Sequence, residues 1–337
     1  MLSLYAKNIM LDSEFLSDIA IGSNNDVVSV IMDTGSADLW MFSTECQTCQ
    51  TTSPHKYYRP RDSTTFYNSS TTFELRYGDG SYTAGTVGSD TVTVAGAPIQ
   101  GQSIDVPWHI SANLLSNAMD GIMGLGFPSL SQIRMPTPLS NMLTQKIIPK
   151  AVLGLQYIKT RQWSYEGGGG AWTFGGWDTS AIVGALTWVD ITEPVYWKIN
   201  LPKVRVGSVY EYVPTQQVIV DSGTTLILLD PTSVANIHKY LPGGRLSATD
   251  GTGHWQIFCN ATSDYYTGSR NVYFSIGGKD WGVPARDLAW YPEQAYPGYC
   301  YSLIQPWGES FGILGVAFLK NVYAVFDQDR AKFGLGT

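Results

Sequence analysis

The chain has 337 residues, more than a single hydrophobic core usually supports, so two lobes are expected. Hydrophobic residues make up 44% of the chain and charged residues only 15%, and its 35 Gly, 17 Pro and 20 Tyr are typical of a turn-rich β protein, not of a disordered chain. Acidic residues outnumber basic residues by 28 to 21, and Lys and Arg form no basic stripe, so we expect no nucleic-acid partner.

Membrane insertion is not expected either. Apolar stretches such as residues 27–32 are far shorter than a bilayer span, and residues 1–5 lack the layout of a signal peptide. The sequence therefore predicts a soluble chain of mature length with no membrane partner.

Several segments are predicted strands. The apolar residues 30–32 lead into Asp33, and residues 90–94 and 271–276 alternate or are rich in β-branched side chains, with Gly-containing turns after both. The tetraglycine at 167–170 is predicted to be a flexible hairpin tip and not a phosphate-binding loop, because no helix with a following Lys-Ser or Lys-Thr succeeds it.

Helices are expected to be few and short. Residues 136–146 carry apolar side chains at helical spacing. Asp230 can cap another helix whose first residue is Pro231, because proline is favoured at that position.

The four cysteines are Cys46, Cys49, Cys259 and Cys300, which allow three disulfide pairings. Proximity along the chain favours Cys46 with Cys49 and Cys259 with Cys300. A redox motif or half of a zinc site competes with a disulfide for the first pair. The four His residues are scattered, however, so we expect no metal site.

Asn68 and Asn260 each begin an Asn-X-Ser/Thr triplet. Such triplets accept glycans only in secretory proteins, so these two residues are glycosylation candidates.

The chain contains an internal repeat, which fixes the expected architecture before any detail does. Val30-Ile31-Met32-Asp33-Thr34-Gly35-Ser36 aligns with Val218-Ile219-Val220-Asp221-Ser222-Gly223-Thr224, 188 residues later. A second pair of motifs follows in the same order, because residues 120–127 resemble residues 311–318. We therefore expect two homologous β-rich lobes, residues 1–182 with the first Asp motif and residues 183–337 with the second.

The repeated Asp-hydroxyl-Gly turns carry the expected chemistry. Two related halves would bring Asp33 and Asp221 face to face, and two carboxyl groups that close share a proton, which raises one pKa and lowers the other. The ionised group can take a proton from water while the protonated group donates to a carbonyl oxygen, which suits hydrolysis without a cofactor or a metal.

The hydroxyl groups beside the two acids also have predicted roles. Ser36 and Thr224 can donate to the outer carboxylate oxygens, while Thr34 and Ser222 can bond across to the opposite turn. Asp, Ser and Gly are common in ordinary strand-ending turns too, but two such turns in register within a duplicated chain favour a functional pair.

These motifs resemble the pepsin family of aspartic proteases, particularly its secreted fungal branch. The resemblance runs nearly end to end, and it is carried by Ile19-Ala20-Ile21-Gly22, Asp33-Thr34-Gly35-Ser36-Ala37-Asp38-Leu39-Trp40, Tyr77-Gly78-Asp79-Gly80-Ser81, both Gly-containing apolar motifs and Ala324-Val325-Phe326-Asp327.

The resemblance implies a predominantly all-β, two-lobed acid protease fold with a central cleft and a closing hairpin, the flap. It implies an endopeptidase that cuts extended polypeptides in acid, that prefers large apolar residues, and that statine-type compounds inhibit. It also implies a secreted, or vacuolar or lysosome-like, location, a zymogen precursor and a monomer.

The same resemblance assigns further site residues. Tyr77 matches the flap tyrosine, whose phenol can bond toward the Trp40 indole, and Gly78 would let the flap tip move. Asp79 resembles an acid that helps fungal relatives accept Lys next to the cut; a plain turn Asp is the alternative. Five apolar residues match positions that line or support the family's cleft, namely Ile31, Ile122, Trp197, Ile219 and Ile313. Taken singly, such residues are more often part of the core.

One departure from the family pattern bears on the site. Val316 stands where an Asp commonly follows Ile-Leu-Gly, which leaves the local hydrogen bonding of the second half open. Two other classes compete with the protease. The first is a binding protein that has this fold but has lost catalysis. The second is a glycosidase, which would also use two carboxylates and could bind sugars with some of the 11 Trp residues.

Overall fold

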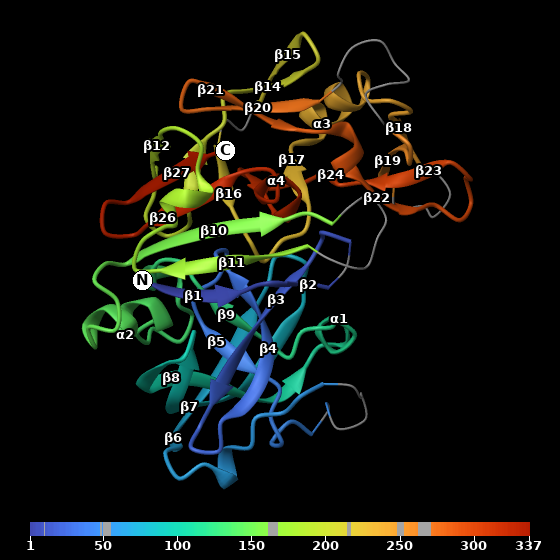
Figure 1. Ribbon diagram of the computed structural model, residues 1–337. Helices are drawn as coiled ribbons and strands as arrows, with labels where there is room; N and C mark the ends of the chain where they lie inside the picture. Colours follow the sequence, from blue (N-terminus) through green and yellow to red (C-terminus); the bar gives the residue numbers. More distant parts are fainter. Residues whose placement is uncertain are drawn as a thin grey trace.

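The computed structural model of the chain describes residues 1–9, 11–47, 49, 55–160, 168–213, 217–247, 253–261 and 271–337. Within these ranges the backbone forms five sheets connected by turns and a few short helices (Figure 1). The predicted class, mostly β with few helices, is confirmed.

An eight-stranded sheet is built from the N-terminal part of the chain, and it is the blue and teal region of Figure 1. In sheet order its strands are β2 (Lys7–Asn8), β3 (Phe15–Ile21), β4 (Asp26–Asp33), β9 (Gly121–Gly124), β5 (Leu39–Met41), β8 (Ala97–Ile110), β7 (Tyr82–Val94) and β6 (Tyr67–Arg76). The predicted strand at 90–94 is the last part of β7.

Three sheets come from the C-terminal part of the chain. The five-stranded one has the order β13 (Lys198–Asn200), β16 (Gln217–Val220), β25 (Gly312–Leu314), β17 (Ile227–Leu229), β24 (Ile304–Pro306). The first four-stranded one has the order β15 (Val209–Tyr212), β14 (Lys203–Val206), β20 (Val272–Ile276), β21 (Lys279–Val283). The second has the order β18 (Arg245–Leu246), β19 (Trp255–Phe258), β23 (Tyr299–Ser302), β22 (Ala289–Pro292).

A six-stranded sheet combines strands from both parts of the chain. Its order is β1 (Leu2–Tyr5), β11 (Gly169–Phe174), β10 (Val152–Ile158), β26 (Tyr323–Asp327), β27 (Lys332–Gly336), β12 (Thr187–Asp190). In Figure 1 β10 and β11 cross the middle of the molecule, between the teal and the orange regions. This sheet therefore takes strands from both sides of the boundary expected after residue 182.

The helices are short. They are α1 (Ala112–Leu115), α2 (Pro138–Thr144), α3 (Pro231–His238) and α4 (Val316–Leu319), with 3-10 turns η1 (Pro60–Asp62), η2 (Pro128–Leu130), η3 (Thr179–Ala181) and η4 (Ala285–Leu288). Both predicted helices are confirmed as α2 and α3. Asp230 caps α3 as expected, because its Oδ1 accepts a hydrogen bond from the Ser233 amide at 2.9 Å.

The strand order shows the internal repeat directly. In the first half β4 pairs in parallel with β9, and β9 pairs antiparallel with β5. In the second half β16 pairs in parallel with β25, and β25 pairs antiparallel with β17. Asp33 is the last residue of β4 and Asp221 directly follows β16, so the two repeated motifs end equivalent strands.

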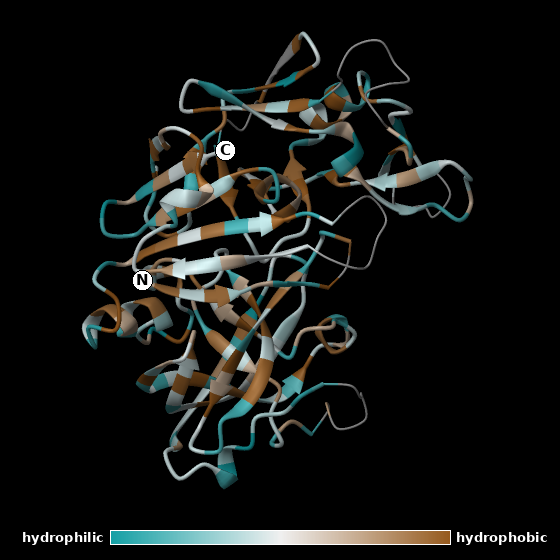
Figure 2. Ribbon diagram, in the orientation of Figure 1, coloured by the Kyte–Doolittle hydropathy of each residue, from teal (hydrophilic) through white to brown (hydrophobic). Residues whose placement is uncertain are grey.

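One large hydrophobic core spans both halves. Hydrophobic residues, brown in Figure 2, are concentrated in the strands, while hydrophilic residues, in teal, predominate in many of the connections. Trp172 of β11 and Phe326 of β26 pack with ring centroids 6.3 Å apart, and both are essentially inaccessible to solvent. The six-stranded sheet contributes to this core, so strands from both halves pack together in it.

The tetraglycine differs from its prediction as a hairpin tip. Gly167 lies outside the described residues, but Gly169 and Gly170 are the first residues of β11 and pair with Ile158 and Tyr157. A Cβ on Gly170 would lie 2.1 Å from the Gln156 carbonyl oxygen, so close strand approach, not only turn flexibility, accounts for glycine there.

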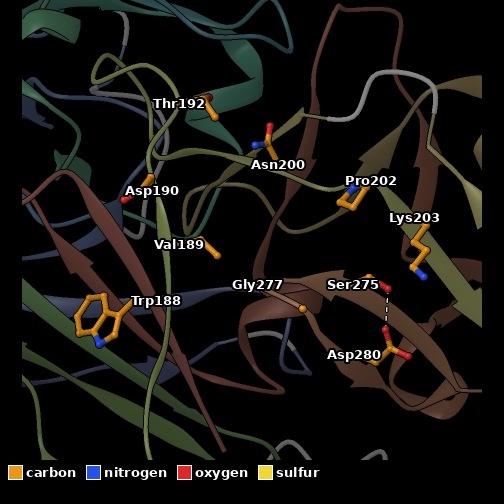
Figure 3. A pocket seen from close by; sticks show the side chains of 11 residues that line it. Trp188, Val189, Asp190, Thr192, Asn200, Pro202, Lys203, Ser275, Gly277 and Asp280 are labelled. Carbon is orange, nitrogen blue, oxygen red and sulfur yellow. Dashed lines mark hydrogen bonds between the residues drawn. The ribbon is translucent and has the colours of Figure 1, made fainter.

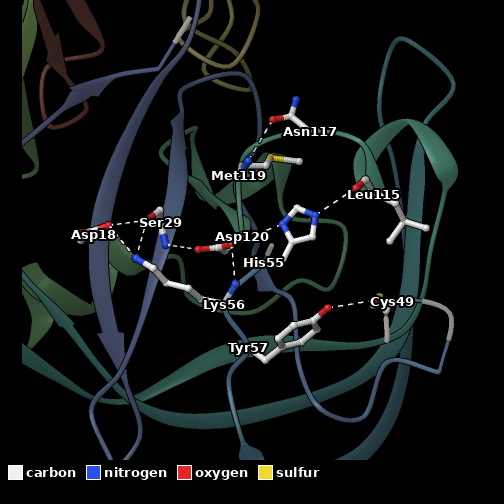
Figure 4. Close-up of polar contacts among 10 residues, drawn as sticks. All are labelled: Asp18, Ser29, Cys49, His55, Lys56, Tyr57, Leu115, Asn117, Met119 and Asp120. Carbon is white, nitrogen blue, oxygen red and sulfur yellow. Dashed lines mark hydrogen bonds and ion pairs between the residues drawn. The ribbon is translucent and has the colours of Figure 1, made fainter. Parts of the chain in front are cut away.

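Asp120, directly before β9, fixes the strand that leads to Asp33 (Figure 4). Its Oδ2 accepts a hydrogen bond from the Ser29 amide of β4 at 2.8 Å, and its Oδ1 accepts one from the Lys56 amide at 2.9 Å. The His55 ring lies on the same carboxylate, with Nδ1 3.5 Å from Oδ1. One buried carboxylate thus ties β4 to the chain before β9 and to the loop at residues 55 and 56.

The two disulfides follow the pairing that chain proximity favours. Cys46 is bonded to Cys49, and Cys259 is bonded to Cys300, which lies on β23. Both glycosylation candidates, Asn68 and Asn260, are exposed, although Thr262 of the second triplet lies outside the described residues.

The larger disulfide loop is expected to contribute more stability. Cys259 and Cys300 are 41 residues apart and Cys46 and Cys49 only 3. In the chain-entropy model, replacing Cys259 and Cys300 by Ser should lower the free energy of unfolding by about 4 kcal/mol. Replacing Cys46 and Cys49 by Ser should lower it by about 2 kcal/mol. Urea unfolding of both double variants measures this, and equal losses would contradict it.

Candidate active site

The two Asp-hydroxyl-Gly turns meet at the centre of the molecule through a reciprocal pair of hydrogen bonds. The Thr34 amide donates to Ser222 Oγ at 3.0 Å, and the Ser222 amide donates to Thr34 Oγ1 at 2.9 Å. These residues occupy equivalent places in the repeat, 188 positions apart. The turns predicted to face one another therefore do so.

Each of these hydroxyl groups also donates across the same junction. Thr34 Oγ1 donates to the Val220 carbonyl at 2.9 Å, and Ser222 Oγ donates to the Met32 carbonyl at 2.6 Å. Both hydroxyls are buried and both have a donor and an acceptor partner. The ends of β4 and β16 are thus joined by four hydrogen bonds.

The two carboxyl groups are held in matching local environments. Asp33 accepts hydrogen bonds from the Gly35 amide at 2.8 Å and from Ser36 Oγ at 2.5 Å. Asp221 accepts them from the Gly223 amide at 2.8 Å and from Thr224 Oγ1 at 2.6 Å. The side-chain hydroxyls therefore donate where the sequence predicts, and both acids are only 5% and 7% exposed, respectively.

The glycines of the two turns are required by space. A Cβ on Gly35 would lie 2.6 Å from the Asp221 carboxyl group, and one on Gly223 would lie 2.3 Å from Asp33 Oδ1. Neither glycine has a positive φ. Both glycines lie in turns, and the close approach of the opposite acid, not a left-handed backbone, is what requires glycine there.

Burial and the second acid change the ionisation of the first. Burial, followed by the charge of Asp221 and a hydrogen bond between the two carboxyl groups, raises the pKa of Asp33 well above its usual value. A pair of acids this close shares a proton, so one member can donate a proton while the other accepts one.

The flap expected around Tyr77 is the turn between β6 and β7. The Tyr77 amide donates to the Ser81 carbonyl at 2.9 Å, and Gly80, with φ of +81°, allows the turn to close. The Trp40 indole Nε1 donates to the Tyr77 hydroxyl at 2.6 Å, so the expected contact between these two rings is present.

Asp79 at the flap tip makes the local hydrogen bonds of a turn residue. Its Oδ1 accepts from the Ser81 amide at 2.9 Å and from Ser81 Oγ at 2.6 Å, and the residue is exposed. These bonds occupy one carboxylate oxygen and leave the charge at the surface.

The remaining predicted cleft residues fall into two apolar patches and the core. Ile31 and Ile122 are paired across β4 and β9 and share a cluster with Trp40 and Tyr77. Equivalent positions in the repeat are held by Ile219 and Ile313, which are paired across β16 and β25 in a cluster of their own.

Trp197 has a different place from the isoleucines. It is fully buried in the main core, and its Nε1 donates to the Leu125 carbonyl at 3.2 Å. The Leu125 amide in turn donates to the Asp33 carbonyl at 2.7 Å. Trp197 therefore supports the backbone beside Asp33 through Leu125.

Val316 keeps the backbone contact at its position without a carboxylate. Its side chain is buried at the start of α4, and its amide donates to the Thr224 carbonyl at 2.8 Å. A backbone hydrogen bond thus connects the turn after Asp221 to α4.

Sequence reasoning missed Trp307, which directly follows β24. Its ring lies 3.3 Å from where a Cβ on Gly78 would be, so the flap tip of the first half reaches a side chain of the second. Trp307 packs with the patch of Ile219 and Ile313. No local pattern marks it, because its importance arises from a contact between residues far apart in sequence.

A separate hollow lies away from these residues, between β12 and the hairpin of β20 and β21 (Figure 3). Its walls include Trp188, Lys203 and Asp280, and the Ser275 hydroxyl donates to Asp280 at 2.6 Å. It contains none of the predicted site residues. Over the described ranges, no three His, Cys, Asp or Glu side chains are grouped to hold a metal ion.

Comparison with known proteins identifies the family. A family model described as eukaryotic aspartyl protease matches residues 14–337. The chain belongs to this family. Syncephapepsin of Syncephalastrum racemosum is 32% identical over 94% of this chain and 75% of its own length, and rhizopuspepsin-2 of Rhizopus niveus is 32% identical over 94% and 77%. Cathepsin E of Rattus norvegicus is 31% identical over 96% and 80%.

The protease is therefore a hydrolase of the aspartic endopeptidase type, and the resemblance found in its sequence is confirmed. Pepsin-like proteases act on polypeptides and are inhibited by statine-type compounds. No helix in the described part of the protease is both long and apolar enough to span a membrane.

The hydroxyl junction is expected to stabilise the protease strongly. Thr34→Val removes a buried hydroxyl while keeping the side-chain shape, and it leaves the Ser222 amide and the Val220 carbonyl without partners. We expect the free energy of unfolding to fall by about 2–4 kcal/mol, whereas Thr34→Ser keeps the hydroxyl and should lose much less. Urea unfolding of the two variants checks this, and equal losses would count against it.

Proposed function

We propose that this protease hydrolyses peptide bonds in acid with a water molecule activated by Asp33 and Asp221. The observation that carries the proposal is the meeting of the two turns, which holds both acids in matching hydrogen-bonded environments on either side of one junction. The ionised acid takes a proton from the water as it attacks, and the protonated acid donates to the carbonyl oxygen of the substrate. Neither step needs a metal or a covalent intermediate.

The pH range of activity follows from the shared proton. Because the pKa of Asp33 is raised by burial and by Asp221, this acid keeps its proton above the pH at which an ordinary Asp loses it. Activity should persist while one proton remains on the pair and disappear when pH rises through the raised pKa.

The substrate is proposed to be an extended polypeptide with large apolar residues at the cut. The patch of Ile31 and Ile122 beside Tyr77 lies on one side of the acids, and the patch of Ile219 and Ile313 belongs to the other half. Such surfaces favour apolar side chains on both sides of the cleaved bond. Tyr77 and Gly78, in the flap, would cover the bound chain and exclude water from it.

We further propose two lobes, residues 1–182 and 183–337, in a monomeric protease that is secreted or works in an acidic compartment. A location in the secretory pathway is compatible with both disulfides and with glycans at the exposed Asn68 and Asn260. An acid-working location matches an excess of carboxyl groups, which lose much of their mutual repulsion on protonation.

Cleavage of an unfolded protein from about pH 2 to 7 tests the mechanism. We expect acid-limited cleavage that a statine-type inhibitor abolishes, and Asp33→Asn should lower the rate by about 10³-fold or more because the acid-base pair is lost. The exposed Asp62→Asn is a matched control and should retain activity. A folded wild type that binds the inhibitor but cuts nothing would instead indicate a binding protein.

The charge of Asp79 is proposed to let the protease accept Lys next to the cut. Peptides that differ only in Lys, norleucine or Phe at that position separate charge from size. Asp79→Ala should lower kcat/KM for the Lys peptide by about fivefold, since an exposed ion pair contributes up to about 1 kcal/mol, and should leave the other two peptides little changed. Unchanged Lys cleavage in the variant would reduce Asp79 to a turn residue.

A further inference from the structure

Asp105 is a fully buried acid whose carboxyl group has no partner in the described part of the chain. It lies on β8, its exposed fraction is 0%, and neither of its oxygens has a hydrogen-bond partner there. Other buried acids of the same sheet are well satisfied. Asp90 on β7, for example, accepts hydrogen bonds from Tyr58, Thr65 and Thr91. Asp105 therefore departs from the rule that buried polar groups are hydrogen-bonded.

The register of the sheet places Asp105 beside the flap contact. Asp105 is paired with Trp40 of β5 and with Val87 of β7. Residues directly opposite one another in a sheet share a face, so Asp105 lies on the face that carries Trp40 and Val87. These two residues belong to the same hydrophobic cluster, and Tyr77 packs against it.

The protonation of Asp105 is set by these surroundings. The titratable groups found to face it are Asp38, on the loop before β5, and Tyr77 of the flap, while β5 and β7 present Trp40 and Val87, which do not titrate. Burial, followed by the charge of Asp38, raises the pKa of Asp105 well above its usual value. Asp38 accepts hydrogen bonds from Ser131 and Gln132, so Asp38 carries a charge more easily than Asp105 does.

We propose that Asp105 is a positioning residue of the flap. While it is uncharged, Asp105 supports Trp40, and Trp40 in turn holds the phenol of Tyr77. When Asp105 ionises, it disturbs both Trp40 and Tyr77. An unpaired charge in this apolar cluster is costly, so the ionised group must draw water toward it or displace its neighbours. The neighbour directly opposite is Trp40, whose indole holds the Tyr77 hydroxyl at 2.6 Å. The inference rests on the proposed role of Tyr77 in the flap.

The pH dependence has a defined sign. An acid whose pKa is raised in the folded state contributes stability that is complete below about pH 3.9, the ordinary Asp value, and that is lost as pH rises through the folded-state pKa. Loss of the Asp105 proton therefore weakens the fold and the flap contact on the alkaline side. This is a second effect of pH beside the titration of Asp33.

Asp105→Asn tests the proposal, because Asn has nearly the shape of the protonated acid but cannot ionise. Urea midpoints and kcat/KM for one peptide are measured from about pH 3 to 7.5. We expect the alkaline loss of stability to move up by about 0.5 pH unit or more. The ratio of kcat/KM in the variant to that in wild type should rise at least about threefold between about pH 4 and 6.5, since the catalytic pair titrates alike in both.

Three further variants make the result specific. Asp90→Asn removes an equally buried but hydrogen-bonded acid of the same sheet, and it should lower stability without moving the alkaline limit. Asp105→Leu gives a second uncharged side chain if the Asn variant folds poorly, and it should move the limit in the same direction. In a Tyr77→Phe background, which lacks the hydroxyl that Trp40 holds, the pH-dependent gain in kcat/KM from Asp105→Asn should disappear.

Parallel pH profiles of wild type and both Asp105 variants, in stability and in kcat/KM, would overturn the proposal. A gain in kcat/KM that persists unchanged in the Tyr77→Phe background would overturn the route through the flap. If wild type cut no substrate at any pH, the proposed function would fail, and the stability profiles would still decide whether Asp105 ionises within the fold.

Discussion

The structure depends on the hydrogen-bonded junction of Thr34 and Ser222. Their amides and hydroxyls exchange hydrogen bonds, and each hydroxyl also donates to a carbonyl of the opposite strand end. Four buried bonds at one point leave the two turns little freedom to separate, because an opened bond would leave polar groups unpaired away from water. The distance between the acids is therefore a property of the backbone, not of two independently mobile side chains.

This junction holds two acids, Asp33 and Asp221, close together although their charges repel. Two nearly buried acids repel one another when both are charged. The fold gives each acid an amide and a hydroxyl donor and omits a Cβ from both glycines. A shared proton removes the remaining repulsion, and the same proton is the one that acid-base hydrolysis requires.

The flap connects the two halves beside the acids. The hairpin that carries Tyr77 belongs to the first half, and its tip reaches Trp307 of the second half. Asp105, beneath the Trp40 contact, likewise belongs to the first half. The proposed catalytic pair thus lies on the duplicated turns, while the proposed roles in access and in pH response fall to the flap and to Asp105.

Local sequence determined a large part of this protein. The duplicated Asp-hydroxyl-Gly turns, the roles of their hydroxyls as donors, the cap of α3 and the pairing of the cysteines all follow from short-range patterns, and the structure agrees with them. Only the tertiary structure decided why Gly35 and Gly223 are glycine, that Trp197 is core, and that Trp307 and Asp105 adjoin the flap. The reason is that patterns report a residue's neighbours along the chain, whereas burial and close approach depend on residues that folding brings together.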